Sequence, residues 1–132
     1  MNVRLLARAA AHLAVLGLAA LPLAACEEDP TAAGTNEPAM IVLDRSVTNQ
    51  LVNVPFVRIA YVIDQRFNRL PIAVSVTSEK PNVVRVDSAR FLPELRETRA
   101  FLTALAPDTS TILTFSAAGL TAQMKVVSVR QP

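Results

Sequence analysis

From Met40 onward the sequence is a succession of short apolar runs separated by turn-forming residues. The runs are Met40–Leu43, Val47–Val54, Phe56–Ile63, Ile72–Thr77, Val83–Val86, Arg99–Leu105, Thr111–Ser116 and Thr121–Val129. Several of them alternate with a period of two, and Pro, Asn or Asp stands between them, which is typical of short β-strands. No long stretch has helical periodicity. Seven or eight such strands predict an all-β sandwich or barrel.

The alternation in residues 56–63 predicts which side chains face the core. Its odd-numbered residues are apolar, whereas Arg58 and Ala60 occupy the opposite face. We therefore expect the odd-numbered face to point inward. With the same reasoning applied to the other runs, the complete set of predicted core residues is Ile59, Tyr61, Val74, Val86, Leu105, Ile112 and Val126.

The first 25 residues have the organisation of an export signal. Two arginines and no acid precede an apolar run, and Pro22 is followed closely by the small residues Ala24 and Ala25. This order of a basic start, an apolar centre and a small-residue exit is typical of secretory signals. The apolar run is shorter than the ~20 residues that span a membrane. Cleavage after Ala25 by the ordinary signal peptidase is disfavoured, because the large Leu23 lies three residues before the cut.

The segment Leu23-Ala24-Ala25-Cys26 resembles the lipobox of bacterial lipoproteins at every position. The resemblance implies that Cys26 becomes the first residue of the mature protein and carries lipid, through which the protein would partner the membrane. Two or three acyl chains hold a protein almost permanently, whereas one holds it weakly. The alternatives are an uncleaved anchor and a buried free thiol. Glu27 favours the outer membrane, facing the periplasm or the cell surface, since aspartate at this position tends to retain enteric lipoproteins in the inner membrane.

These features divide the chain into a signal peptide (1–25), a lipidated cysteine with a flexible tether (26–38) and a β-sandwich domain (39–132). Residues 27–38 lack large apolar side chains and contain two prolines and a glycine, which predicts disorder. Of the 13 Lys and Arg residues, two leave with the signal, whereas all 11 acids remain, so the mature chain has no formal net charge. No basic cluster with interleaved aromatic residues is present, so we expect no nucleic-acid partner.

The residue types of the mature chain do not favour catalysis. The single histidine, His12, lies in the signal, and Cys26 is the single cysteine. A Ser-His-Asp or Cys-His site therefore cannot be assembled, and a zinc site lacks its usual ligands. We expect no catalytic residues, no metal and no cofactor, and we predict that the protein is not an enzyme.

Two stretches resemble the signatures of bacterial Ig-like domains, group 2. Ser78–Asp87 is similar to the serine-turn-proline-valine-aspartate signature, and Leu102–Ile112 is similar to the later threonine-rich one. The glycine expected before Thr109 is replaced by Asp108, which tolerates the left-handed backbone conformation better than most residues. The resemblance covers about residues 39–130. It implies an Ig-like β-sandwich of about seven strands, of the type found in intimin- and invasin-like surface proteins.

Residues 88–100 are longer than this family pattern explains. Pro93 fits the first position of a short helix, although a solvated connection that lengthens a hairpin is the simpler interpretation. The functional alternative is a partner-binding loop, since rigid β-scaffolds often carry recognition on loops. Its candidate contact residues are Phe91, Leu92, Leu95 and Arg96. We expect Phe67 and Phe91 to pack, and we expect a short link in place of residues 94–98 to leave the domain folded.

Two classes of function remain. The first is a membrane-tethered, non-catalytic Ig-like module at the bacterial cell envelope, acting in adhesion, in protein–protein interaction or as a structural spacer. The second is a small accessory lipoprotein that binds a soluble ligand such as a glycan, or that inhibits an enzyme. An exposed row of aromatic side chains on one sheet face would favour a glycan, whereas an apolar patch would favour an envelope protein as partner.

Overall fold

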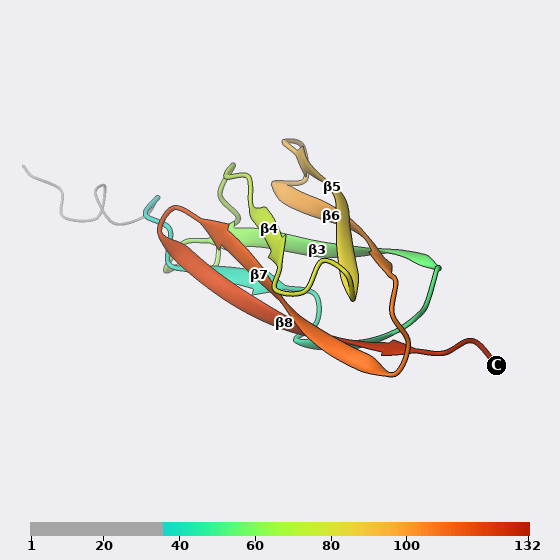
Figure 1. The fold of residues 1–132 in the computed structure, drawn as a ribbon. Coiled ribbons are helices and arrows are strands. Elements are labelled where there is room, and N and C mark those ends of the chain that lie inside the picture. The colour runs from blue at the N-terminus through green and yellow to red at the C-terminus, as the bar shows by residue number, and fades with distance from the viewer. Residues whose placement is uncertain (1–35) are drawn as a thin grey trace, which may run out of the picture. The chain divides into compact units, whose positions relative to one another are not determined.

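Eight strands build the part of the chain that the computed structural model describes, residues 36–132 (Figure 1). They are β1 (Met40–Leu43), β2 (Val47–Leu51), β3 (Pro55–Ile63), β4 (Ser75–Ser78), β5 (Val84–Leu92), β6 (Glu97–Ala104), β7 (Thr109–Ala117) and β8 (Leu120–Val129). The predicted signal peptide, the lipobox with Cys26, and most of the predicted tether lie outside the described residues.

The strands form two four-stranded sheets. Sheet A has the order β1-β3-β6-β5, and sheet B has the order β2-β8-β7-β4. All neighbours are antiparallel except β2 and β8, which are parallel. The chain changes sheet at each connection from β1 to β5 and again between β6 and β7, whereas the β5–β6 and β7–β8 hairpins each stay within one sheet. The prediction of an all-β, Ig-like sandwich is confirmed, with eight strands in place of about seven.

The core lies between the two sheets and is made mainly of aliphatic side chains. Its most completely buried large side chains are Val62, Val84, Leu102, Leu113, Phe115, Met124 and Val126. They come from five different strands of both sheets, and Leu113 and Phe115 occupy alternate positions of β7. Since the sequence has one cysteine, burial of this apolar surface holds the sheets together without an intrachain disulfide.

The predicted core is correct in part. Val74 and Val126 are buried, whereas Ile59, Tyr61, Val86, Leu105 and Ile112 are only half-buried. In β3 the inward face holds the even-numbered residues, because Ala60 and Val62 are 1% and 0% exposed. The predicted phase of β3 is therefore wrong by one residue, and a slip of one residue exchanges the two faces of a strand.

Arg58 accounts for the wrong phase, because this charged residue lies on the inward face of β3. Its guanidinium reaches from sheet A to sheet B, where Nη2 donates to Thr48 Oγ1 at 2.6 Å. Asp44, in the connection where the chain changes sheet, lies 3.8 Å from Nη1. A long charged side chain can thus bury its stem while its head finds polar partners at the margin of the core.

Strand β5 is longer than predicted because it continues past a bulge. The pairing with β6 shifts between Val86 and Ser88, so Asp87 is an extra residue in the strand. Thr103 Oγ1 donates to Asp87 Oδ2 at 2.6 Å, and this bond, with the neighbouring Arg85, holds the pKa of Asp87 below its ordinary value. Residues 88–92 are polar or alternate poorly, which concealed the second half of the strand.

Two turns of the domain contain residues with positive φ, and the first was predicted. Asp108, at the position where the family pattern has glycine, adopts the left-handed conformation with φ 57°. Gly119 lies in the turn between β7 and β8, with φ 76°. Ala118 precedes it with φ 50°, so both central residues of this two-residue turn have positive φ, as a type I′ hairpin requires.

Candidate functional site

The segment that the family pattern did not explain forms the distal half of the β5–β6 hairpin. Leu92 pairs with Glu97, and residues 93–96 make the turn, so the hairpin interpretation is confirmed and no helix begins at Pro93. The Arg96 amide donates to the Pro93 carbonyl at 3.3 Å, and Arg96 adopts a positive φ of 50°. Residues 93–96 therefore form the turn at the end of β5 and β6, whereas Thr98 and Arg99 still pair with β3.

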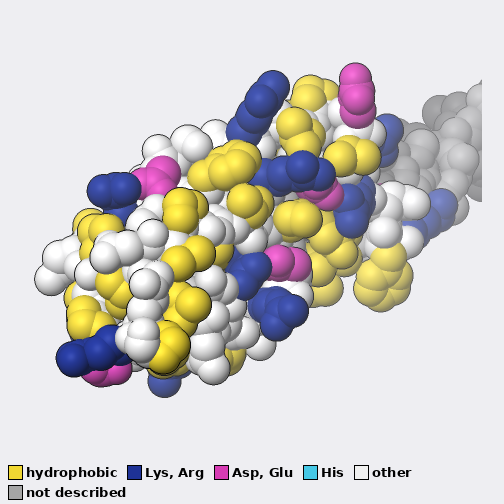
Figure 2. All heavy atoms as spheres, turned by 90° about the vertical axis from the view of Figure 1, so that its right-hand side faces the viewer, with side chains coloured by type: hydrophobic (Ala, Val, Ile, Leu, Met, Phe, Trp, Pro, Cys, Tyr) yellow, Lys and Arg dark blue, Asp and Glu magenta, His cyan; other side chains and the backbone are white. Residues whose placement is uncertain are grey.

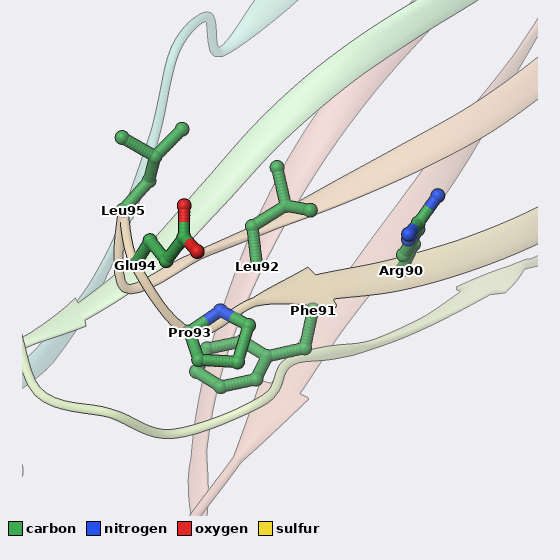
Figure 3. Close-up of a pocket in the computed structure, with 6 residues that line it drawn as sticks. All are labelled: Arg90, Phe91, Leu92, Pro93, Glu94 and Leu95. Carbon is green, nitrogen blue, oxygen red and sulfur yellow. The ribbon is translucent and has the colours of Figure 1, made fainter.

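The candidate contact residues lie at or near the tip of this hairpin. A shallow, open hollow of about 390 Å³ is lined by residues 90–95. Figure 3 shows Leu92 and Leu95 on one side of the hairpin and Phe91 on the other. Leu95 is 49% exposed, whereas Phe91 and Leu92 are half-buried. Arg96 is exposed and turns toward another loop, so the structure brings three of the four predicted residues to the hollow and directs the fourth elsewhere.

That second loop follows β3 and is organised by the carboxylate of Asp64. Asp64 Oδ1 accepts hydrogen bonds from the amides of Arg66 at 2.8 Å and Asn68 at 2.9 Å, and Oδ2 accepts one from Asn68 Nδ2 at 3.1 Å. Burial opposes ionisation of this carboxyl, but the hydrogen bonds from Asn68 and Arg66 hold the pKa of Asp64 below its ordinary value. The loop is therefore fixed by an ionised side chain at its base.

Phe67 lies at the tip of this loop and contradicts the expectation that it packs. Its residue is 78% exposed, and its φ is 64°. The Phe67 amide donates to the Asp64 carbonyl at 3.1 Å, which closes the turn. The turn thus holds an aromatic side chain in solvent.

The loop and the hairpin tip are joined by arginine side chains. Arg69 Nη1 donates to the Leu95 carbonyl at 3.2 Å, and Arg96 Nη1 donates to the Arg69 carbonyl at 2.9 Å. Glu97, which is 6% exposed, accepts from Arg69 Nη1 at 3.1 Å and from Arg99 Nε at 3.0 Å. These charged pairs bind two segments that are 26–28 residues apart in the sequence into one surface.

Arg69 also covers the only tyrosine. Its guanidinium carbon lies 3.8 Å from the centroid of the Tyr61 ring, a cation–π contact on the outer face of sheet A. Tyr61 is consequently half-buried although it points away from the core. The alternation had placed Tyr61 in the core. The residue instead faces outward, and the Arg69 side chain shields it from solvent.

We call this surface the arginine-rich end of the sandwich. It is formed by Arg66, Phe67, Arg69, Arg90, Leu95, Arg96 and Arg99. Five arginines face three carboxylates here, those of Asp64, Glu94 and Glu97. Figure 2 shows one face of the molecule, where Lys and Arg side chains alternate with apolar ones and Asp and Glu are fewer. The surface combines positive charge with exposed apolar groups.

Asp64→Asn is expected to lower stability at neutral pH and to flatten its dependence on acid. Because folding depresses the pKa of Asp64, its stabilisation is present above the ordinary value of 3.8 and is lost as the pH falls through the folded pKa. Urea unfolding of both forms at neutral pH and at about pH 3 measures the difference, which should shrink in acid. Asp108→Asn is the control, since its exposed ion pair with Arg130 should contribute little. Equal losses at both pH values would contradict the expectation.

Within residues 36–132, no three His, Cys, Asp or Glu side chains gather as metal ligands would. This same range contains no helix long and apolar enough to cross a membrane. The arginine-rich end offers donors for charge-assisted hydrogen bonds together with exposed apolar groups.

Comparison with known proteins identifies the fold. No family model matches the chain, and no curated protein matches its sequence. Solved structures do resemble it, among them domains 4 and 5 of the S-layer protein SbsC, with 20% identity and a TM-score of 0.62 over 70% of this chain and 53% of that one. A longer SbsC structure, domains 4–9, has 19% identity and a TM-score of 0.65 over 73% of this chain and 15% of that one.

The adhesin InvE of Yersinia pseudotuberculosis is also similar, with 15% identity and a TM-score of 0.55 over 76% of this chain and 29% of that one. In each case the chain spans little more than half of the similar structure, or less. At these identities the likeness concerns the fold. The described domain is thus an Ig-like β-sandwich, similar to modules of S-layer and adhesin proteins.

Proposed function

We propose that this chain is an exported bacterial lipoprotein whose Ig-like domain is a non-catalytic interaction module at the cell envelope. The observation that carries the proposal is the position of Cys26, which ends a segment similar to the lipobox at every position and lies shortly before an Ig-like sandwich. The similarity of the fold to S-layer and adhesin domains supports an envelope location. The lipid on Cys26 would hold the protein to the membrane, with the outer membrane favoured by Glu27.

An interaction role has more support than a catalytic one. Residues 36–132 contain neither histidine nor cysteine, the side chains that most often serve as general base or thiol nucleophile. The domain does offer a surface of exposed apolar side chains and arginines, which are groups enriched where proteins bind partners. The module would thus act by holding or contacting envelope components.

The glycan-binding alternative has less support. Sugar rings stack on open aromatic faces, whereas the Tyr61 ring on the outer face of sheet A is covered by Arg69 at 3.8 Å. Phe101 lies on the same face and is 38% exposed, and Phe67 lies at the loop tip. These rings do not form a row, and an apolar patch with arginines fits a protein or membrane contact better.

Cys26→Ser is expected to abolish acylation and to leave residues 1–25 attached. Serine cannot form the thioether that would carry the diacylglyceryl group, so neither lipid attachment nor the cleavage that depends on it would occur. Mass spectrometry of the purified protein detects the acyl groups and shows whether residues 1–25 remain, and detergent phase partitioning compares the two forms. Glu28→Gln is the control, because it leaves the lipobox and Glu27 intact. A serine variant that still partitions with detergent through an acyl group would contradict the proposal.

A further inference from the structure

Phe67 is held in solvent by a conformation that phenylalanine rarely adopts. A left-handed backbone is unfavourable for a residue with a bulky side chain, and such strain persists where the surrounding structure imposes it. Here the Asp64 carboxylate imposes it through the amides of Arg66 and Asn68. Since the 78% exposed ring contributes little to packing, the loop presents an apolar group outward at a cost in stability.

Basic side chains lie on both segments that form this end. Arg66 precedes Phe67 in its loop. In the β5–β6 hairpin, Leu95 and Arg96 lie in the turn, and Arg90 lies in β5 opposite Arg99. Among the arginines of this end, Arg69 and Arg99 form ion pairs with described residues, whereas Arg66, Arg90 and Arg96 do not. Exposed apolar side chains with Lys or Arg beside them are typical of surfaces that bind anionic membranes. The apolar side chains enter the headgroup layer, and the cations contact lipid phosphates.

The chain enters the domain at this same end. The Ala39 amide donates to the Ile63 carbonyl at 2.8 Å, and Met40 pairs with Ile63. Ile63 in turn forms a bridge with Arg69, the last basic residue of the loop that carries Phe67. Residues 27–39 can span at most about 45 Å when fully extended. If Cys26 is lipidated, the tether therefore keeps the arginine-rich end within this distance of the anchoring bilayer.

We propose that the arginine-rich end docks on the anionic phospholipid surface of the membrane to which Cys26 anchors the protein, with Phe67 and Leu95 entering the headgroup layer. This inference rests on the proposed lipid anchor for its place in the cell, but the surface itself is a property of residues 36–132. Tethering supplies an effective concentration in the millimolar range, so an intrinsically weak contact suffices to keep the domain docked. The docked domain would lie against the bilayer and leave the opposite end of the sandwich facing the aqueous space.

The test uses the mature chain carrying Cys26→Ser, so that no lipid contributes to binding. It is mixed with vesicles of phosphatidylethanolamine containing a minority of phosphatidylglycerol, and with vesicles of phosphatidylcholine alone. Co-sedimentation is expected with the anionic vesicles and should weaken at high salt. No co-sedimentation is expected with phosphatidylcholine, because its choline group balances the phosphate charge that the arginines would bind.

Phe67→Asn separates membrane docking from folding. Asparagine accepts the left-handed conformation readily, so the melting temperature should stay the same or rise, whereas affinity for anionic vesicles should fall about tenfold or more through loss of the ring. Arg66→Gln and Arg90→Gln should each lower that affinity about fivefold. The matched controls lie at the other end of the sandwich, where Val54→Ser and Arg130→Gln should leave binding unchanged.

Three results would overturn the proposal. One is binding to anionic vesicles that none of the Phe67, Arg66 and Arg90 variants weakens. Another is a lack of binding even at millimolar protein. The third is a concentration-dependent dimer in sedimentation equilibrium that Phe67→Asn abolishes, because the surface would then be an interface between copies. The anchor is tested separately: vesicle binding by the serine form with no acyl group found on the cellular protein would reject the proposed lipoprotein while retaining the docking surface.

Discussion

Leu113→Ala is expected to destabilise the domain by about 2–5 kcal/mol, the range for a large aliphatic side chain removed from a closed core. Leu113 is 0% exposed and lies on the inner face of β7, opposite Met124 of β8. A small domain has a total stability of roughly 5–15 kcal/mol, so this loss is a large share of it. Thermal unfolding should show a fall in Tm of about 10 °C or more.

Ile112→Ala is the matched control, since it removes a side chain of the same volume from the next residue. The structure places Ile112 on the outer face of β7, where it is half-buried and pairs with Lys125. Its truncation should cost about 1 kcal/mol, because solvent already reaches much of the side chain. A larger loss for Ile112→Ala than for Leu113→Ala would mean that β7 is displaced by one residue and that its alternation is reversed.

Replacing Glu94–Thr98 with a short Gly-Ser link is expected to cost about 3 kcal/mol or more, contrary to the expectation from the sequence that the domain tolerates it. Thr98 is 2% exposed, and its hydroxyl accepts a hydrogen bond from the Val74 amide at 2.9 Å. Loss of that acceptor leaves a buried amide without a partner, which costs about 1–3 kcal/mol. Loss of Glu97 also leaves Arg69 and Arg99 without their shared carboxylate.

A shorter replacement, limited to Glu94, Leu95 and Arg96, should cost about 1 kcal/mol or less. These residues are exposed, and glycine at position 96 suits the positive φ of 50° found there. Urea unfolding of the two replacements, with Thr98→Val as a single-site comparison, measures the difference. If the longer replacement were as stable as the shorter one, Glu97 and Thr98 would not hold the hairpin to the sandwich.

The strands could be predicted from the sequence because their apolar runs end at turn residues. The faces were harder, because β3 is apolar on both sides and Arg58 lies on the inner one. A charged residue was taken to point outward, but its guanidinium has partners in Thr48 and Asp44 across the sandwich. The alternation of apolar residues shows where a strand lies and leaves two candidate inward faces. The side chains that contact the strand from the other sheet decide which of the two faces is buried.

Only one of the two segments that form the candidate site, the β5–β6 hairpin, could be predicted from the sequence. The hairpin residues Phe91, Leu92 and Leu95 stood out because the segment exceeds the family pattern. The loop of Asp64 and Phe67 was not connected with it, since their contact depends on the pairing of β3 with β6. One local signal was present: Asp64 and Asn68 flank a phenylalanine in a polar loop, and such side chains often bind nearby backbone amides.

The parallel pairing of β2 with β8 determines how the domain meets mechanical load. A pull applied between the start of β1 and the end of β8 draws β2 and β8 along their length in opposite directions. Their pairs, from Val47 with Lys125 to Leu51 with Val129, are then loaded in shear and must yield together, unlike a hairpin that opens one pair at a time. When the domain is pulled between its two ends, unfolding therefore requires the hydrogen bonds between β2 and β8 to break together.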